Sequence, residues 1–277
     1  MDQKTALDVN NTANLQAVRF FLLDFDGTFC LGEHLIEGAL RFIEVLRSQG
    51  KDFLFVTNNS SKHPWQYAHK ITHLGLPIDA GKVFTSGEGT ARYLAARYKP
   101  KLLRLYLVGT PALEEQFKQH GFKLVKAQPQ VVVLGFDTTL TYEKLSILCT
   151  WVSNGLPYFA THPDINCPTE DGFIPDIGAM IAFVKTSTGR DPDAIIGKPN
   201  RLMVEMISQK FNRPFSDLAI IGDRLYTDIA LGQACGIPSV LVLSGETRRA
   251  DLASSPYQPT WVFNHLGELA EILASTF

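Results

Sequence analysis

The chain has 277 residues, of which 45% are hydrophobic and 19% charged, and its formal net charge is −2. This composition is that of an ordinary globular protein, and the near-neutral charge gives no reason to expect a surface that binds nucleic acid. No apolar run approaches the roughly 18 residues of a membrane-spanning helix, so we expect no membrane span.

Cysteine usage and the first residues of the chain predict a cytoplasmic location. Residues 1–16 are polar and lack the apolar stretch of a signal peptide, so we expect a loosely ordered leader there. Scattered cysteines without a Cys-x-x-Cys pair favour free thiols in a reducing compartment. The chain has four of them: Cys30, Cys149, Cys167 and Cys235.

The first elements alternate between apolar runs and amphipathic segments. The pattern predicts a strand at 18–24, a helix at 38–49, a strand at 52–57 and a helix at 63–74. Such alternation is typical of an α/β fold with a mostly parallel sheet. Residues 1–84 supply too few strands to complete a sheet by themselves.

The middle of the chain repeats this alternation over roughly 100 residues, a normal domain size. The predicted elements there are helix 87–98, strand 104–108, helix 111–120, strand 131–135, helix 142–153, strand 157–160 and helix 176–188. We expect this segment, residues 85–187, to be an α/β domain inserted into the first one.

The last part of the chain completes the first domain, which then consists of residues 1–84 and 188–277. Its predicted elements are strand 193–197, helix 199–211, strand 217–222, helix 225–235, strands 237–243 and 260–263, and helix 265–274. The stretch 217–222 is apolar on both faces, as a central parallel strand should be.

Polar residues with chemical potential follow four of these strands. Asp24 and Asp26 end the first strand, and such crowded carboxylates are costly unless a cation or a shared proton relieves them. Thr57, Asn58 and Asn59 follow the second strand, where backbone N–H groups and a helix start suit phosphate oxygens. Each motif alone has a plain structural explanation as a turn or a helix cap.

Two further motifs come late in the chain. Lys198 lies between Gly197 and Pro199 at a strand–helix junction, and Asp223 and Asp228 follow the strand at 217–222. Ligands of open α/β sheets bind at the carboxyl ends of the strands, so the four motifs are expected to converge. Several carboxylates with one lysine suit Mg²⁺ beside a phosphate group.

The order of these motifs resembles the haloacid dehalogenase (HAD) superfamily of phosphohydrolases. It reads Asp-x-Asp-Gly-Thr from Asp24, then Thr57-Asn58-Asn59, then Lys198, then Gly-Asp with Asp228 five residues after Asp223. Lys198 follows Thr57 by 141 positions, and an α/β insertion at this point resembles the class II, subtype A cap of the NagD/4-nitrophenylphosphatase-like family. The resemblance covers residues 18–275 and implies a Rossmann-like parallel-sheet core, 1–84 with 188–277, and an α/β cap, 85–187.

The resemblance also implies a role for each motif. Asp24 is expected to be the nucleophile that forms an aspartyl-phosphate, and Asp26 the general acid and then the base for water. Mg²⁺ would be held by Asp24, the Asp26 carbonyl and Asp223, with Asp228 acting through water or by orienting its neighbours. Thr57, Asn58 and Asn59 would bind the phosphoryl oxygens, and Lys198 would neutralise them.

A loop at 161–178 is expected to face the leaving group, with four candidate specificity residues: His162, Asp164, Asn166 and Cys167. The expected substrate is a small phosphorylated metabolite that the sequence does not name. Related caps occur in monomers and homodimers, and both stay open here. Asp176 stands where many relatives have a small residue, which the sequence leaves uninterpreted.

Two other functions compete with a phosphatase. A phosphotransferase or phosphomutase of this superfamily usually has a helical cap between the first two motifs, where this chain has only 33 residues from Asp24 to Thr57. A non-catalytic phosphate-binding protein on the same scaffold would be signalled by a missing nucleophile or lysine, and both are present. The sequence therefore favours a phosphatase.

Overall fold

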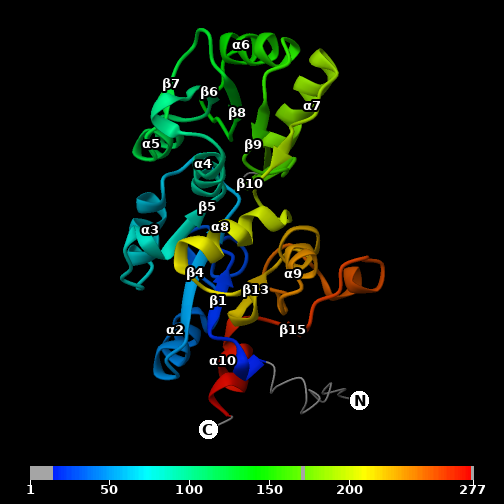
Figure 1. The fold of residues 1–277 in the computed structure, drawn as a ribbon. Helices are drawn as coiled ribbons and strands as arrows, with labels where there is room; N and C mark the ends of the chain where they lie inside the picture. Colours follow the sequence, from blue (N-terminus) through cyan, green and yellow to red (C-terminus); the bar gives the residue numbers. More distant parts are fainter. Residues whose placement is uncertain (1–14, 170–171, 276–277) are drawn as a thin grey trace. The chain divides into compact units, whose positions relative to one another are not determined.

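The computed structural model of the chain describes residues 15–169 and 172–275 (Figure 1). The predicted leader at 1–16 lies outside the described residues except for its last two positions. The chain divides into two compact units: residues 1–55, 74–76 and 212–277 form the first, and residues 56–73 and 77–211 form the second.

Parallel strands form the first unit: β1 (Phe20–Leu23), β4 (Asp52–Thr57), β13 (Leu218–Gly222), β14 (Ser239–Val242) and β15 (Trp261–Phe263). Their order across the sheet is β15-β14-β13-β1-β4. Phe20 lies opposite Leu218 of β13 on one side and Asp52 of β4 on the other. All four residues of β1 are buried, as expected for a strand covered on both faces.

Helices and a short hairpin complete the first unit: β2 (Cys30–Leu31), β3 (His34–Leu35), α2 (Ala39–Ser48), α9 (Ala230–Cys235) and α10 (Leu266–Ala274). Helices α2 and α10 pack side by side (Figure 1). Gly38 has a φ of +74°, and a Cβ built on it would lie 2.1 Å from the Cα of Gly267. Glycine at this position therefore permits both the left-handed backbone and the close approach.

A second parallel sheet, in the order β12-β9-β8-β6-β7, organises the second unit. Its strands are β6 (Arg104–Val108), β7 (Lys123–Leu124), β8 (Val131–Leu134), β9 (Tyr158–Ala160) and β12 (Ala194–Ile195). The last two residues of β4 also belong to this unit, and β5 (Val83–Thr85) follows β4 in the strand order. An antiparallel hairpin pairs β10 (Asn166–Thr169) with β11 (Gly172–Pro175).

The helices of the second unit are α3 (Pro64–His73), α4 (Ser86–Arg97), α5 (Pro111–Gln119), α6 (Tyr142–Ser153), α7 (Ile177–Thr188) and α8 (Arg201–Phe211). Threonine caps begin α4, α5 and α6, each side chain accepting a backbone N–H of the first turn. Buried side chains of α6 and α7, among them Leu148 and Val184, pack with Val132 and Tyr158 of the sheet.

The predicted α/β class with parallel sheets is confirmed, and one strand is placed differently. Residues 193–197 are predicted to belong to the same sheet as 18–24, but β12 pairs with β9, Ala194 lying opposite Phe159. A two-residue apolar strand carries no pattern that identifies its sheet. In the part of the chain that the structure describes, no helix is long and apolar enough to cross a membrane.

Candidate functional site

Asp24 lies directly after β1, which ends one residue earlier than predicted. Its N–H continues the ladder between β1 and β13 by donating to the Ile221 carbonyl at 2.9 Å. Asp24 is buried, whereas Asp26 is exposed. The chain turns at Gly27, whose φ is +82°.

Asp223 follows the neighbouring strand β13 and is 2% exposed. One carboxylate oxygen, Oδ2, accepts the Glu246 N–H at 2.7 Å, and the other, Oδ1, lies 3.4 Å from the Thr28 hydroxyl. Asp228 is fully buried, and its Oδ2 accepts the Arg224 N–H at 3.3 Å and the Thr227 hydroxyl at 3.2 Å. Both carboxylates are therefore held in fixed orientations.

The carboxylates of Asp24, Asp223 and Asp228 lie together, with one oxygen of each within 4.8 Å of the others. Three buried carboxylates at this spacing repel one another unless positive charge offsets them. Hard oxygen ligands from two or three carboxylates are what Mg²⁺ and Ca²⁺ prefer. The donor set therefore fits a divalent cation. The group contains Asp24, Asp223 and Asp228 of the predicted metal residues, while Asp26, predicted to contribute its backbone carbonyl, is outside it.

Arg224 contributes positive charge to the same region. Burial by itself lowers the pKa of its guanidinium, but the negative charges of Asp24, Asp223 and Glu246 hold that pKa above its usual value. Its Nε lies 3.0 Å from Oε2 of Glu246, whose Oε1 accepts the Tyr226 hydroxyl at 2.7 Å. Glu246 thus bridges Arg224 to a residue of the π-helical turn Leu225–Ile229, which precedes α9.

The loop after β14 is hydrogen-bonded both to the turn at Gly27 and to Asp223, a candidate metal ligand. The hydroxyl of Ser244 donates to the Gly27 carbonyl at 2.8 Å, and the Thr247 N–H donates to the Asp223 carbonyl at 3.2 Å. A Cβ on Gly245 would lie 2.0 Å from Oδ2 of Asp223. Only glycine lets this loop approach the carboxylate so closely.

In the second unit, a tight turn follows β4. Thr57 and Asn58 are buried, and the Thr57 hydroxyl accepts the Asn59 N–H at 3.2 Å. The Asn59 carboxamide oxygen accepts the Ser61 N–H at 2.9 Å and its hydroxyl at 2.7 Å. Side chains thus order the turn before α3 begins, and a turn of this kind can present N–H groups to an anion.

Lys198 and Asn58 lie together in the same unit. The Lys198 N–H donates to the Asn58 carboxamide oxygen at 2.8 Å, and its Nζ donates to the Val56 carbonyl at 3.2 Å. Lys198 is 3% exposed, and an ammonium group is rarely buried in a protein unless its charge is paired. A buried ammonium is suited to an anionic ligand.

The four cap candidates have different surroundings. His162 is fully buried and contacts Asp176, while Asp164 accepts the Asn58 carboxamide N–H at 2.9 Å. Asn166 and Cys167 are on β10 of the hairpin, where Asn166 is exposed and Cys167 partly buried. The candidates therefore comprise a fully buried His162, a partly buried Asp164 that is bonded to Asn58, and two residues of the hairpin.

The structure adds two features that the sequence reasoning missed. Arg224 directly follows the Gly-Asp pair, and Gly245 follows the apolar strand β14. The sequence does contain an indication of both residues, since each follows the carboxyl end of a parallel strand, where ligands bind. A single arginine or glycine there is too common a loop residue to be selected without its contacts.

Comparison with known proteins identifies the family. The family model of haloacid dehalogenase-like hydrolases matches residues 21–123, and a second HAD-hydrolase-like model matches residues 195–269. The 5′-nucleotidase YutF of Bacillus subtilis is 32% identical over 254 residues, covering 92% of this chain and 98% of the relative. The chain belongs to the haloacid dehalogenase-like hydrolases.

Solved structures of this family share the fold over most of the chain. A 4-nitrophenylphosphatase from Thermotoga maritima has 46% identity and a TM-score of 0.90, covering 93% of this chain and 98% of its own. A glycerol phosphate phosphatase from Mycobacterium tuberculosis, solved with magnesium, has 32% identity and a TM-score of 0.84, covering 92% of this chain and 78% of its own. The predicted membership of the NagD/4-nitrophenylphosphatase-like family is confirmed.

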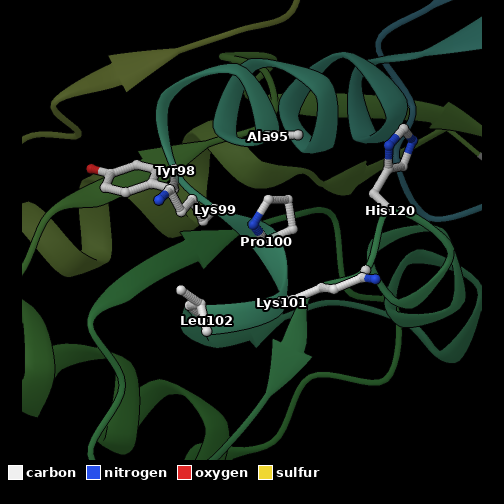
Figure 2. A pocket seen from close by; sticks show the side chains of 8 residues that line it. Ala95, Tyr98, Lys99, Pro100, Lys101, Leu102 and His120 are labelled. Carbon is white, nitrogen blue, oxygen red and sulfur yellow. The ribbon is translucent and has the colours of Figure 1, made fainter.

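The second unit of this HAD-like hydrolase also has a surface hollow, whose lining residues belong to none of the predicted motifs. Figure 2 shows Tyr98, Lys99, Pro100, Lys101 and Leu102 around it, with Ala95 of α4 and His120. None of these residues is a predicted site residue. The hollow therefore contains none of the proposed catalytic residues.

Proposed function

We propose that this chain is a Mg²⁺-dependent phosphatase that hydrolyses a small organic phosphate monoester through an aspartyl-phosphate at Asp24. The chain is a phosphoric monoester hydrolase of the HAD-like family, as the phosphatase and nucleotidase names of its relatives support. The observation that carries the proposal is the group of buried carboxylates, Asp24, Asp223 and Asp228. The magnesium in the related glycerol phosphate phosphatase structure supports the choice of cation.

Asp24 would act as the nucleophile and Asp26 as the acid and base. An Asp24 oxygen forms a bond to phosphorus while the ester oxygen leaves and takes a proton from Asp26. Asp26, now ionised, removes a proton from water, whose oxygen then attacks phosphorus and releases Asp24 and phosphate. The exposure of Asp26 and the burial of Asp24 support this division, because the proton carrier has to exchange with water.

Mg²⁺ would be held by Asp24, the Asp26 backbone carbonyl and Asp223, with Asp228 in support. Its chemistry would be neutralisation of the phosphoryl charge that otherwise repels the Asp24 carboxylate. Hydrogen bonds from an N–H group and a hydroxyl group orient the carboxylates of Asp223 and Asp228, respectively. Arg224 would offset part of the remaining negative charge.

Thr57, Asn58 and Asn59 would bind the phosphoryl oxygens, and Lys198 would neutralise them. The ordered turn after β4 and the buried ammonium group support these roles. Positioning and charge neutralisation provide most of the rate enhancement in phosphoryl transfer. The proposal therefore predicts that these residues affect both substrate binding and the chemical step.

Asp164, Asn166 and Cys167 would select the leaving group, and His162, which is fully buried, would contribute through its neighbours. The relatives differ in the substrate that their names state, nucleotide, nitrophenyl phosphate or glycerol phosphate, so the family alone does not choose one. We propose a core of 1–84 with 188–277 and a cap of 85–187, with the short strand β12 of the 188–277 segment paired to the cap sheet. We also propose a cytoplasmic monomer or homodimer that does not bind nucleic acid.

Hydrolysis of p-nitrophenyl phosphate by the full chain tests the function. We expect phosphate release with MgCl₂, none after EDTA treatment, and recovery when MgCl₂ is restored. Asp24→Asn should abolish turnover while its circular dichroism spectrum stays that of the wild type. A substantial fraction of activity left in Asp24→Asn, or no release from any ester in a panel of phosphate monoesters, would contradict the proposal.

A further inference from the structure

His162 uses both nitrogens of its ring within the protein. Nε2 lies 3.0 Å from Oδ1 of Asp176, and Nδ1 lies 3.0 Å from the Thr161 hydroxyl and 3.3 Å from the Ser86 hydroxyl. The side chain is fully buried. A histidine in this environment has no face left for a substrate, so its contribution has to act through its neighbours.

One assignment of hydrogens satisfies the whole group. Nε2–H donates to the Asp176 carboxylate, and Nδ1 accepts the hydroxyl hydrogen of Thr161. Thr161 accepts in turn from the Ser60 hydroxyl at 3.0 Å, and Ser60 accepts the Phe136 N–H at 2.9 Å. The hydroxyl of Ser86 remains available to donate to the Asn58 carbonyl, which it contacts closely.

Asp176 serves two partners with one oxygen. Its Oδ1 accepts the Ile177 N–H at 2.6 Å, capping the start of α7, and also faces His162. The Asp176 N–H donates to the Ile165 carbonyl at 2.9 Å, and the Gly178 N–H donates to the Asp164 carbonyl at 2.7 Å. The first turn of α7, which follows the hairpin β10–β11, is therefore fixed to the segment 162–165.

The same segment is bonded to the proposed phosphate-binding residues. Asn58 donates from its carboxamide to Asp164 at 2.9 Å and to the Lys198 carbonyl at 2.9 Å. Gly197 completes the packing, since a Cβ there would lie 2.6 Å from Oδ1 of Asn58 and 2.7 Å from the Cβ of His162. Any movement of His162 thus displaces the surroundings of Asn58.

His162, Asp164 and Asp176 have metal-ligand atoms within 4.8 Å of one another, but hydrogen bonds account for this spacing. Nε2 of His162 and Oδ1 of Asp176 bond each other, and Oδ1 of Asp164 accepts from Asn58. The group is therefore a hydrogen-bonded network in this protein and not a second cation site.

We propose that Asp176 and His162 are positioning residues that hold Asn58 and Lys198 in their phosphate-binding arrangement from the start of α7. The inference rests on the proposed function, because it assigns Asn58 and Lys198 to phosphate. It explains why an acid stands at position 176: a small residue could cap the helix, but it would leave His162 without its acceptor. The hairpin that precedes α7 is thereby coupled to phosphate affinity.

Two substitutions at one position separate the helix cap from the bond to His162. Asp176→Ser keeps a good N-cap but is too short to accept from Nε2, while Asp176→Asn keeps both the cap and a carboxamide acceptor. Binding of inorganic phosphate in MgCl₂, measured by titration calorimetry, is the readout. We expect the Kd to rise about 3- to 10-fold in Asp176→Ser, the effect of one lost buried hydrogen bond, and to stay near the wild-type value in Asp176→Asn.

Asp137→Asn is the matched control, because Asp137 is an equally buried acid of the second unit that pairs with Lys144 and caps Thr139. It should lower the melting temperature without changing the phosphate Kd. If Asp176→Ser does not fold, Ser86→Ala tests the next contact of the network, because it removes the hydroxyl that lies 3.3 Å from Nδ1 of His162 and donates to the Asn58 carbonyl.

The inference is overturned if phosphate affinity is unchanged in a folded Asp176→Ser, or in Ser86→Ala as its substitute. The proposed function is unaffected by that result if the wild type hydrolyses p-nitrophenyl phosphate. The inference is also overturned if Asp137→Asn weakens phosphate binding as much, because the effect is then general destabilisation. A wild-type protein that neither binds phosphate nor hydrolyses the ester overturns both proposals.

Discussion

The carboxamide of Asn58 bonds both backbone polar groups of Lys198. Its Oδ1 accepts the Lys198 N–H at 2.8 Å, and its Nδ2 donates to the Lys198 carbonyl at 2.9 Å. The two residues are 140 positions apart in the chain. Asn58 therefore fixes the backbone from which the proposed phosphate-neutralising side chain extends, in addition to any contact of its own with phosphate.

Asn58→Asp tests this relationship with almost no change of size. The remaining Oδ1 can still accept the Lys198 N–H, but the second oxygen then faces the Lys198 carbonyl and the Asp164 carboxylate, which it repels. We expect the free energy of unfolding to fall by about 1–3 kcal/mol, the cost of buried polar groups left unsatisfied. Urea denaturation measures this free energy. An unchanged midpoint would show that the hydrogen bonds between Asn58 and Lys198 do not contribute to stability.

Gly245→Ala tests how the loop after β14 positions Asp223. The new Cβ would overlap Oδ2 of Asp223, 2.0 Å away, and also disturb the Glu246 N–H that this oxygen accepts. We expect Mg²⁺ to bind at least about tenfold more weakly, as is usual when the support of a metal ligand is removed. The dependence of the p-nitrophenyl phosphate rate on MgCl₂ concentration measures this change.

The control is Gly155→Ala, at a glycine with φ of +83° and no atom within 4 Å of a built Cβ. Alanine is strained there, so stability should fall by about 1 kcal/mol with no effect on Mg²⁺ dependence. Equal Mg²⁺ dependence in both variants would refute a specific role for Gly245.

Mg²⁺ itself should stabilise the folded protein through Asp223. A ligand that binds only the native state raises its stability as the ligand concentration increases above Kd. We expect MgCl₂ to raise the melting temperature of the wild type and EDTA to reverse the shift, while Asp223→Asn shows little shift at the same concentrations. Differential scanning fluorimetry gives the comparison, and an identical shift in both proteins would place the cation elsewhere.

His120 predicts a pH effect on stability. Burial lowers the pKa of its imidazole, and the positive charges of Arg92 and Lys210 lower it further against an opposing effect of Glu88. The unfolded chain has the ordinary value near 6.5, so it binds more protons than the folded chain as pH falls through that value. His120 therefore destabilises the fold at acidic pH and has no such effect above about pH 8.

His120→Gln removes this proton-linked penalty. Relative to the wild type, the variant should lose less free energy of unfolding between about pH 8 and pH 5, whatever constant offset the altered packing adds. Urea denaturation of both proteins at the two pH values measures this difference in lost free energy. The carboxylates are the same in both proteins, so their contribution to the pH dependence cancels in the comparison. A wild type that loses no more than the variant would contradict the lowered pKa.

Sequence patterns predict the long elements because each presents its signal over many residues, as helical periodicity or, in the central strand, as a continuous apolar run. Helix 142–153 and strand 217–222 are observed as α6 and β13 within one residue at each end. Two-residue strands such as β7 and β12 carry no period, and β12 was placed in the wrong sheet. Side-chain partners are harder still: nothing near Asp176 in the sequence indicates His162, because their contact depends on how α7 begins.

Trapping of the phosphoryl group tests the central claim, nucleophilic attack by Asp24, most directly. Asp26→Asn should slow the attack of water, so that an acid-quenched reaction with p-nitrophenyl phosphate and MgCl₂ retains phosphate on the enzyme. Mass spectrometry of the digested protein is predicted to find that phosphoryl group on Asp24, and none when Asp24→Asn is added to the same protein. A phosphoryl group on another residue, or wild-type turnover with no phosphorylated Asp24 in Asp26→Asn, would contradict the mechanism.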